Sequence, residues 1–124
     1  MAMGSAGAVE ALGDPVLFEQ VLANVLENAL RHTPPKAGVL VTSRSDGGRV
    51  HVDVTDEGAG VDDADLPRLF EKFFRAPNNA HRGGTGLGLS IARGVMEAMQ
   101  GDITARNRGD GFTGLQVTMT LAAA

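Results

Sequence analysis

The sequence predicts an α/β domain built as a two-layer sandwich, in which about three helices cover one mixed β-sheet. Two segments carry apolar residues at steps of three and four, which is the period of an amphipathic helix, and four short segments are rich in β-branched residues. Each apolar helix face must be buried, and the sheet offers the surface for it. The length of 124 residues, with 43% hydrophobic and 21% charged residues, suits one globular domain.

The composition excludes several classes of protein. The 17 glycines follow no three-residue period and there are five prolines, so the chain is not collagen-like. A net charge of -4 gives no attraction to nucleic acid or to an anionic membrane, and the absence of cysteine excludes a disulfide framework. No apolar run is long enough to span a bilayer. We therefore expect no nucleic acid and no direct membrane contact, and the lack of cysteine is compatible with a reducing, cytoplasmic environment.

The first helix is expected to run from Asp14 to His32. Asp14 is a good N-terminal cap, and Pro15 fits the first turn because its missing N–H would have no partner there. The two prolines at 34–35 end the helix.

A hairpin and a short helical region follow. Residues 38–44 and 49–55 are β-branched runs on either side of a Ser-Asp-Gly-Gly turn at 45–48. Residues 62–75 begin with two aspartates and carry spaced leucines and phenylalanines, which predicts one or two short helices.

The second half is expected to contain a loop, a long helix and two strands. Residues 76–84 are polar and aperiodic, which predicts a mobile loop. The helix is expected from about 87 to 100, with Gly101 as its C-terminal stop. Residues 102–106 and 115–121 are then predicted as strands around a glycine-rich turn.

Three polar residues of the first helix lie on one face. On an ideal helix Asn24, Asn28 and Arg31 fall within an arc of about 60°, opposite the apolar stripe. Amide oxygens suit Mg²⁺, and an arginine binds phosphate oxygens, so this trio fits the phosphates of a nucleotide. The alternative is a solvated polar face on a surface helix.

An Asp-Glu-Gly-Ala-Gly sequence ends the second strand. The Asp56 carboxylate could accept a hydrogen bond from the exocyclic amine of adenine, while Gly58 and Gly60 would let a ligand approach the backbone. The alternative is an acidic turn with two flexible residues.

A glycine-rich run at 83–90 leads directly into the second long helix. Its backbone N–H groups and the positive end of the helix could hold phosphate. The run matches neither the Walker A pattern nor the Rossmann fingerprint, so it would be a third kind of phosphate loop.

Taken in order, these segments resemble the catalytic and ATP-binding domain of sensor histidine kinases, within the wider group of DNA gyrase, Hsp90 and MutL (the Bergerat or GHKL fold). Residues 22–33 resemble the N box, 56–60 the G1 box, 70–75 the F box and 84–90 the G2 box. The resemblance covers residues 13–121, and some details look most like the potassium-responsive KdpD-type kinases.

The resemblance implies a role for each matching residue. Asn24 and Asn28 would hold Mg²⁺ against the phosphates of ATP, and Arg31 would contact a phosphate. Asp56 would bond the adenine amine, and the imidazole of His32 would lie along the adenine ring.

The resemblance also places a lid over the nucleotide. Lys72 and Arg75 would border this lid and reach toward the γ-phosphate, while the phenylalanines of 70–75 would pack at its base. The remaining expected nucleotide contacts come from the two glycine-containing stretches: Gly58, Gly60, Gly84, Thr85, Gly86, Leu87 and Gly88.

One residue separates the kinases from their hydrolytic relatives. In the gyrase and MutL relatives a glutamate four residues before the second asparagine acts as general base on water, whereas this chain has Asn24, which cannot take a proton. The resemblance therefore implies phosphate transfer to a histidine.

The acceptor histidine is expected to lie outside this chain. His32, His51 and His81 do not begin the His-Glu/Asp-x-x-x-Pro segment of a phospho-acceptor. We expect residues 1–12 to be a flexible or cloning-derived N-terminus and 13–121 to be the catalytic domain of a longer, membrane-anchored kinase. Its partners would be a dimerisation and histidine phosphotransfer domain and, indirectly, a response regulator. The alternative is a stand-alone nucleotide-binding module, such as an anti-sigma-factor serine kinase.

Overall fold

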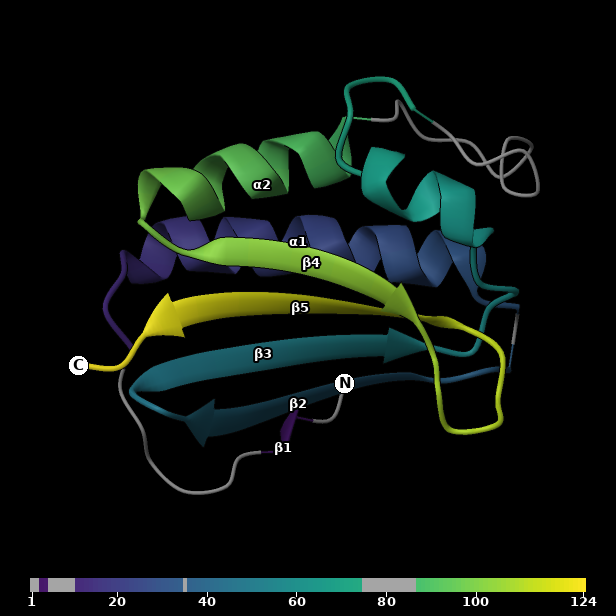
Figure 1. Ribbon diagram of the computed structural model, residues 1–124, viewed down its shortest axis with the longest axis horizontal. Coiled ribbons are helices and arrows are strands. Elements are labelled where there is room, and N and C mark those ends of the chain that lie inside the picture. Colours follow the sequence, from purple (N-terminus) through teal and green to yellow (C-terminus); the bar gives the residue numbers. More distant parts are fainter. Residues whose placement is uncertain (1–2, 5–10, 35, 75–86) are drawn as a thin grey trace.

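Two α-helices lie over one face of a five-stranded sheet (Figure 1). This computed structural model describes residues 3–4, 11–34, 36–74 and 87–124. The elements in chain order are β1 (Met3–Gly4), α1 (Pro15–His32), β2 (Val39–Asp46), β3 (Arg49–Asp56), the 3₁₀ helix η1 (Asp63–Arg68), α2 (Gly88–Ala98), β4 (Asp102–Asn107) and β5 (Leu115–Ala122). The predicted α/β sandwich is confirmed.

The sheet has the strand order β1-β2-β3-β5-β4. The four long strands pair in antiparallel fashion, and the two-residue β1 pairs in parallel with β2, so the sheet is mixed as predicted. Val54 of β3 lies opposite Val41 of β2 and Val117 of β5. Side chains alternate along a strand, so these three valines point to the same face.

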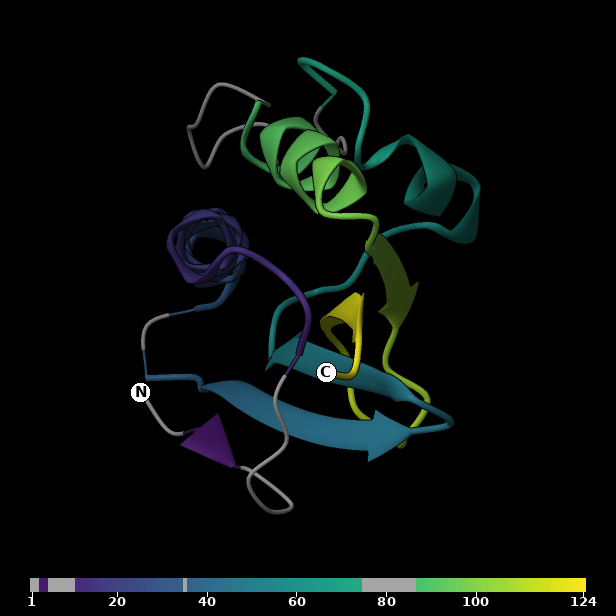
Figure 2. The same ribbon diagram turned by 90° about the vertical axis from the view of Figure 1, so that its left-hand side faces the viewer.

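The core lies between this face and the two helices. Figure 2, an end view, shows both helices on one side of the sheet and none on the other. Both helices contribute fully buried side chains at steps of three or four residues. The buried apolar residues are Val21, Val25, Ala29, Val41, Val54, Val61, Leu89, Ala92, Met96, Ile103, Leu115, Val117, Met119 and Leu121.

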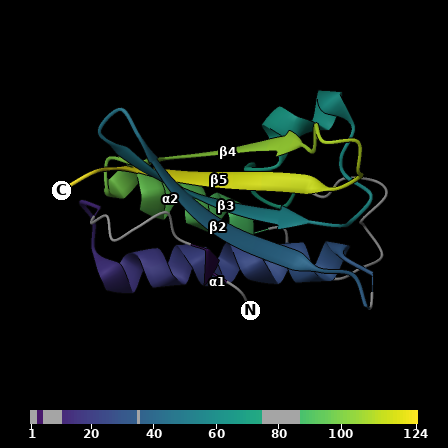
Figure 3. The same ribbon diagram turned by 90° about the horizontal axis from the view of Figure 1, so that it is seen from below.

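The uncovered face of the sheet is polar, and Figure 3 shows its four long strands side by side. Asp53 is buried there with 3% of its surface exposed. Its carboxylate accepts hydrogen bonds from Arg44 Nε at 3.0 Å and from Thr118 Oγ1 at 2.5 Å. These bonds offset the cost of burying a charge, so Asp53 belongs to the sheet rather than to a ligand site.

Helix α1 begins and ends where the sequence predicts. Asp14 Oδ1 accepts hydrogen bonds from the backbone N–H groups of Val16 at 2.9 Å and Leu17 at 3.3 Å. Pro15 occupies the first helical position, and the helix ends at His32, before the prolines.

The turn of the β2–β3 hairpin is shorter than expected. Asp46 pairs with Arg49, which leaves Gly47 and Gly48 as the only turn residues. Their φ angles of 56° and 80° lie in the left-handed region, as a two-residue hairpin turn requires. The predicted turn at 45–48 therefore loses its outer two residues to the strands.

The predicted second helix and its end need two corrections. Helix α2 is shorter than the predicted 87–100, and the left-handed residue after it is Gln100, with φ of 61°, not Gly101. A Cβ atom at Gly101 would lie 2.6 Å from the carbonyl oxygen of Thr120. Glycine is needed there because the chain passes close to β5, rather than for its φ angle.

The ends of the chain contact the sheet. Besides the β1 pairing, the N–H of Leu12 donates to the carbonyl of Ala122 at 2.7 Å, and Ala11 forms a bridge with Ala123. The domain boundary at residue 13 stays a prediction, and the predicted loop at 76–84 lies outside the described residues. None of the helices in the described ranges has the length and apolar character that a membrane crossing needs.

The close approach at Gly101 gives the first prediction. Gly101→Ala should lower the free energy of unfolding by about 1–3 kcal/mol, because the new methyl group overlaps a backbone oxygen of β5. Gly94→Ala is the matched control, since nothing lies within 4 Å of the place that a Cβ atom would take there. The control should be neutral or stabilising by up to about 1 kcal/mol. Urea unfolding measures both, and equal stability of the two variants would contradict this account.

Candidate functional site

Asp56 is the last residue of β3, and its side chain lies on the helix-covered side of the sheet, in line with Val54. It is buried, with 2% exposed. Its Oδ1 accepts hydrogen bonds from the backbone N–H groups of Gly58 at 2.9 Å and Leu115 at 3.0 Å. No described residue donates to Oδ2. One oxygen of the carboxylate is therefore fixed by the backbone, while the other accepts no hydrogen bond from the described residues.

The turn after Asp56 lies against two other parts of the chain. A Cβ atom at Gly58 would collide with the carbonyl oxygen of His32, at the end of α1. At Gly60, φ is 78° and a Cβ atom would lie 2.8 Å from Asn107 Oδ1. Both glycines are thus required by contacts within the protein. Their expected role in leaving room for a ligand stays a prediction.

Both asparagines of α1 are half-buried, and Asn24 lies beside the start of α2. A Cβ atom at Gly88, the first residue of α2, would lie 3.9 Å from the carbonyl oxygen of Asn24. The buried stripe of α1 contains Val21 and Val25, and Asn24 and Asn28 lie on its flank. The expectation that they lie opposite the apolar stripe is therefore wrong, because that stripe is wide and reaches round toward them.

Arg31 lies one turn beyond Asn28 and forms an ion pair with Glu27. The two residues are four positions apart on the helix, a spacing that brings opposite charges together. A phosphate at Arg31 would have to share the guanidinium with this carboxylate. His32 is half-buried next to it, and its contact with adenine stays a prediction.

The start of α2 has no side-chain cap from the described residues. Leu87 stands at the cap position, and Ser90 Oγ donates to its carbonyl oxygen at 2.9 Å. The first N–H groups of a helix have no partners within the helix and attract anions. Gly84, Thr85 and Gly86, the other predicted contacts in this segment, lie outside the described residues.

The segment after η1 only partly matches the expected lid base. Phe70 and Phe74 pack against the core, and the guanidinium of Arg68 lies 4.4 Å from the ring centre of Phe74. Phe73 has φ of 64° and is 69% exposed, so the expectation that it packs there is wrong. Lys72 is exposed, and no described residue binds its ammonium group. Arg75, the other residue expected to border the lid, lies outside the described residues.

Nothing in the sequence pattern marks Arg108, yet it contacts the Asp56 backbone. Its Nη1 donates to the Asp56 carbonyl oxygen at 3.3 Å, and its Nη2 donates to Asp110 Oδ2 at 2.7 Å. The hydrogen bond raises the pKa of Arg108 above its ordinary value and lowers the pKa of Asp110 below its own. A partly polar hollow of about 250 Å³ lies beside Arg108, between the 59–62 turn and the β4–β5 connection.

Metal binding in the described residues would fall to the amides. These residues contain no group of three or more histidine, cysteine or acidic side chains able to hold a metal ion. Asn24 and Asn28 offer neutral oxygen ligands four residues apart, on the same side of α1. This donor set fits Mg²⁺, which keeps several waters and takes further ligands from phosphate.

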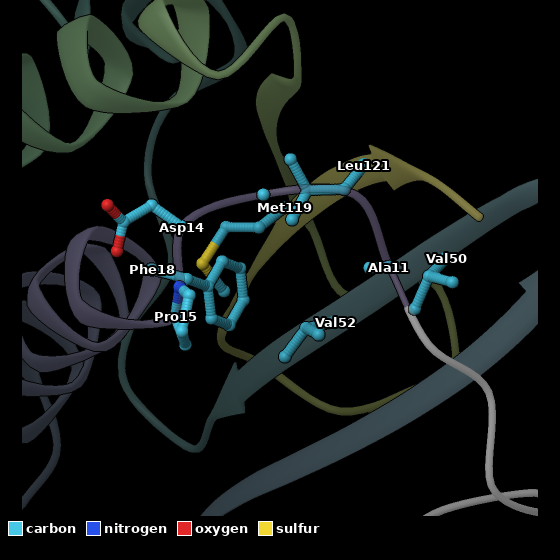
Figure 4. Close-up of a pocket in the computed structure, with 9 residues that line it drawn as sticks. Ala11, Asp14, Pro15, Phe18, Val50, Val52, Met119 and Leu121 are labelled. Carbon is cyan, nitrogen blue, oxygen red and sulfur yellow. The ribbon is translucent and has the colours of Figure 1, made fainter. Parts of the chain in front are cut away.

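A separate apolar cavity of about 190 Å³ lies at the other end of α1 (Figure 4). Phe18, Met119 and Leu121 line it together with Val50 and Val52 near the start of β3. The one carboxylate in its lining is that of the helix cap, which already binds two N–H groups. This cavity therefore offers no chemistry for a charged nucleotide.

Comparison with known proteins gives one matching family, described as "Histidine kinase-, DNA gyrase B-, and HSP90-like ATPase", over residues 13–124. The sensor protein KdpD of Mycobacterium tuberculosis is 42% identical over 117 residues, which are 94% of this chain and 13% of that protein. The sensor protein TorS of Escherichia coli is 42% identical over 94 residues, or 76% of this chain and 10% of the relative. The chain thus spans a small part of the relatives it matches.

Solved structures with the same fold include a sensor histidine kinase. The mycobacterial sensor histidine kinase MprB superposes with a TM-score of 0.84 at 26% identity, covering 98% of this chain and 84% of that one. Full-length ShkA in complex with AMPPNP gives a TM-score of 0.81 at 31% identity, covering 99% of this chain and 25% of that one.

The Arg108–Asp110 pair generates a prediction about pH. Because the folded-state pKa of Asp110 is lowered, its contribution to stability is present above the unfolded-state pKa and is lost as the pH falls through the folded-state value. In Arg108→Gln the Asp110 carboxyl should titrate at higher pH, as followed by its carbon NMR shift. Arg93→Gln is the control, because Arg93 pairs with Glu97 instead. An unchanged titration in Arg108→Gln would show that the pair does not form.

Proposed function

Because the chain belongs to the histidine kinase-, DNA gyrase B- and HSP90-like ATPase family, we propose that it binds Mg²⁺-ATP and donates the γ-phosphate to a histidine on another domain. It would do so as the ATP-binding catalytic domain of a sensor histidine kinase. The observation that carries this proposal is the carboxylate of Asp56 at the end of β3, which accepts two backbone hydrogen bonds through Oδ1, next to a turn that lies against the end of α1.

Asp56 would recognise the adenine base. With Oδ1 held by two backbone N–H groups, Oδ2 is the acceptor for the exocyclic amine. A purine with a carbonyl at that position would place an acceptor against a buried carboxylate, which is unfavourable. The same oxygen would therefore bind adenine and reject such a base.

The phosphates would lie between the two helices. The start of α2, which has no side-chain cap from the described residues, offers backbone N–H groups, and Arg31 offers a guanidinium that is shared with Glu27. The amide oxygens of Asn24 and Asn28 would hold Mg²⁺, which neutralises phosphate charge when bound. Lys72, Arg75 and the glycines at 84 and 86 would complete this region from the lid.

The reaction needs positioning more than a base from this chain. A nitrogen of the acceptor imidazole attacks the γ-phosphorus, the bond to the β-γ bridging oxygen breaks, and ADP leaves while the imidazole gives its proton to solvent. Asn24 cannot activate water, so hydrolysis has no general base at that position. The domain would supply orientation and charge stabilisation.

The acceptor and the sensor would belong to a longer parent protein. The chain spans between 9% and 25% of the length of curated relatives such as TorS, SphS, KdpD and BvgS, which are sensor proteins. We propose a dimerisation and histidine phosphotransfer domain as the direct partner, a response regulator as the next acceptor, and a membrane-anchored parent with this domain on the cytoplasmic side. The ShkA complex with AMPPNP supports an ATP-type nucleotide as ligand.

Base recognition by Asp56 predicts a change in nucleotide preference. Asp56→Asn replaces one carboxylate oxygen by the NH2 group of an amide, which is a donor. The affinity for ATP should therefore fall by about tenfold or more, whereas the affinity for inosine triphosphate should not fall. Calorimetric titration with both nucleotides measures the ratio. Asp53→Asn, on the opposite face of the same strand, is the matched control and should leave the ratio unchanged. An unchanged ratio in Asp56→Asn would place adenine elsewhere.

Phosphate transfer is tested by reconstitution. The chain, labelled ATP, Mg²⁺ and a separately purified histidine-bearing dimerisation domain of a closely similar sensor kinase should yield acid-labile phosphohistidine. Asn28→Ala should reduce this rate by about a hundredfold, because a metal-holding oxygen is lost. Gln20→Ala, exposed on the same helix, should have no effect. Bound nucleotide without phosphohistidine from the unaltered chain would favour a regulatory nucleotide-binding module instead.

A further inference from the structure

The side chain of Asn107, the last residue of β4, holds the turn that follows Asp56. Its Oδ1 accepts a hydrogen bond from the Val61 N–H at 2.9 Å. Its Nδ2 donates to the Val61 carbonyl oxygen and, at 3.3 Å, to Asp63 Oδ1. One amide thus binds both backbone groups of a buried residue that lies 46 positions away in the sequence.

The turn also rests on this amide sterically. Gly60 has φ of 78°, and a Cβ atom there would come within 2.8 Å of Asn107 Oδ1. Only glycine therefore fits at position 60 beside the Asn107 amide. Asn107 fixes the far end of the turn by hydrogen bonds and leaves no room there for a larger residue than glycine.

The near end of the turn is held from the same connection between β4 and β5. Arg108 donates to the Asp56 carbonyl oxygen at 3.3 Å, and the Leu115 N–H donates to Asp56 Oδ1 at 3.0 Å. The Arg108 guanidinium is in turn paired with Asp110, and its side chain is 16% exposed. Both ends of the 56–61 turn are thereby tied to the residues that link β4 to β5.

From this arrangement we propose that Asn107 is a positioning residue for base recognition: it orders the 56–61 turn so that Asp56 Oδ2 points at the base. The inference rests on the proposed role of Asp56 in binding adenine. An oxygen that is already ordered loses less entropy when it binds, and it discriminates better between a donor and an acceptor. Asn107 needs no contact with the nucleotide to have this effect.

The test measures the ratio of the dissociation constants for inosine triphosphate and ATP. In Asn107→Ala the Val61 N–H and C=O lose their partners, and the ratio should fall by about five- to tenfold. Arg106→Ala is the matched control, because Arg106 is the preceding residue, lies on the uncovered face and pairs with Gln116. The control should keep the ratio of the unaltered chain.

A double substitution separates positioning from general damage to the fold. If Asn107 acts through Asp56, Asn107→Ala should have no further effect on the ratio in an Asp56→Asn background. Equal effects in the two backgrounds would overturn the inference. The inference would also be overturned if the ratio fell in Asp56→Asn but stayed unchanged in Asn107→Ala. In that case the proposed function would still stand. An unchanged ratio in Asp56→Asn would instead overturn the proposed placement of adenine.

A measurement on the unaltered chain does not depend on how well a variant folds. The Val61 N–H, bonded to a side chain, should exchange with deuterium at least about a hundredfold more slowly than an unprotected amide. Exchange of this amide at the unprotected rate would show that the hydrogen bond from Val61 to Asn107 is not formed in solution, and it would overturn the inference.

Discussion

The hydrogen bond from the Leu115 N–H to Asp56 Oδ1 is the interaction on which the proposed site depends. The ladder between β3 and β5 ends at the pair of Thr55 and Gln116. The N–H of Leu115, the neighbouring residue of β5, donates to the side chain of Asp56. The carboxylate thus takes the position of a backbone acceptor at the end of the sheet. Two N–H donors to Oδ1 offset the cost of burying its charge, and no described residue donates to the other oxygen.

The rest of the site is arranged around this fixed point by close backbone contacts. Gly58 lets the turn lie against the end of α1, and the start of α2 lies beside the backbone of Asn24. The base would be recognised by the sheet and its turn, and the phosphates by the two helices. In the proposed function the sheet and its turn would select the nucleotide, while the segment between η1 and α2 would supply the remaining cations.

Local rules account for the parts that the sequence predicts well. An Asp-Pro pair begins α1 because cap and first turn involve neighbouring residues only, and apolar periodicity identifies both long helices. The four long strands and the layer order follow in the same way. The place of Asp56 at the end of a strand was also predictable, since β-branched residues precede it and glycines follow.

Contacts between distant residues account for what the sequence does not predict. By pattern Asn107 follows the predicted strand 102–106 as the first residue of a turn, and its bond partner lies 46 positions earlier. Gly101 resembles a helix stop, but the structure needs it for passage beside β5. Phe73 fits an apolar spacing, yet a left-handed φ angle turns it outward.

The most direct test of the central claim is a crystal structure of this chain with Mg²⁺ and a non-hydrolysable ATP analogue. Our account predicts the exocyclic amine within hydrogen-bond distance of Asp56 Oδ2, with Oδ1 still bound to the N–H groups of Gly58 and Leu115. It also predicts the metal ion at the amide oxygens of α1. A base bound away from Asp56, or a carboxylate that exchanges its Leu115 bond for the ligand, would contradict it.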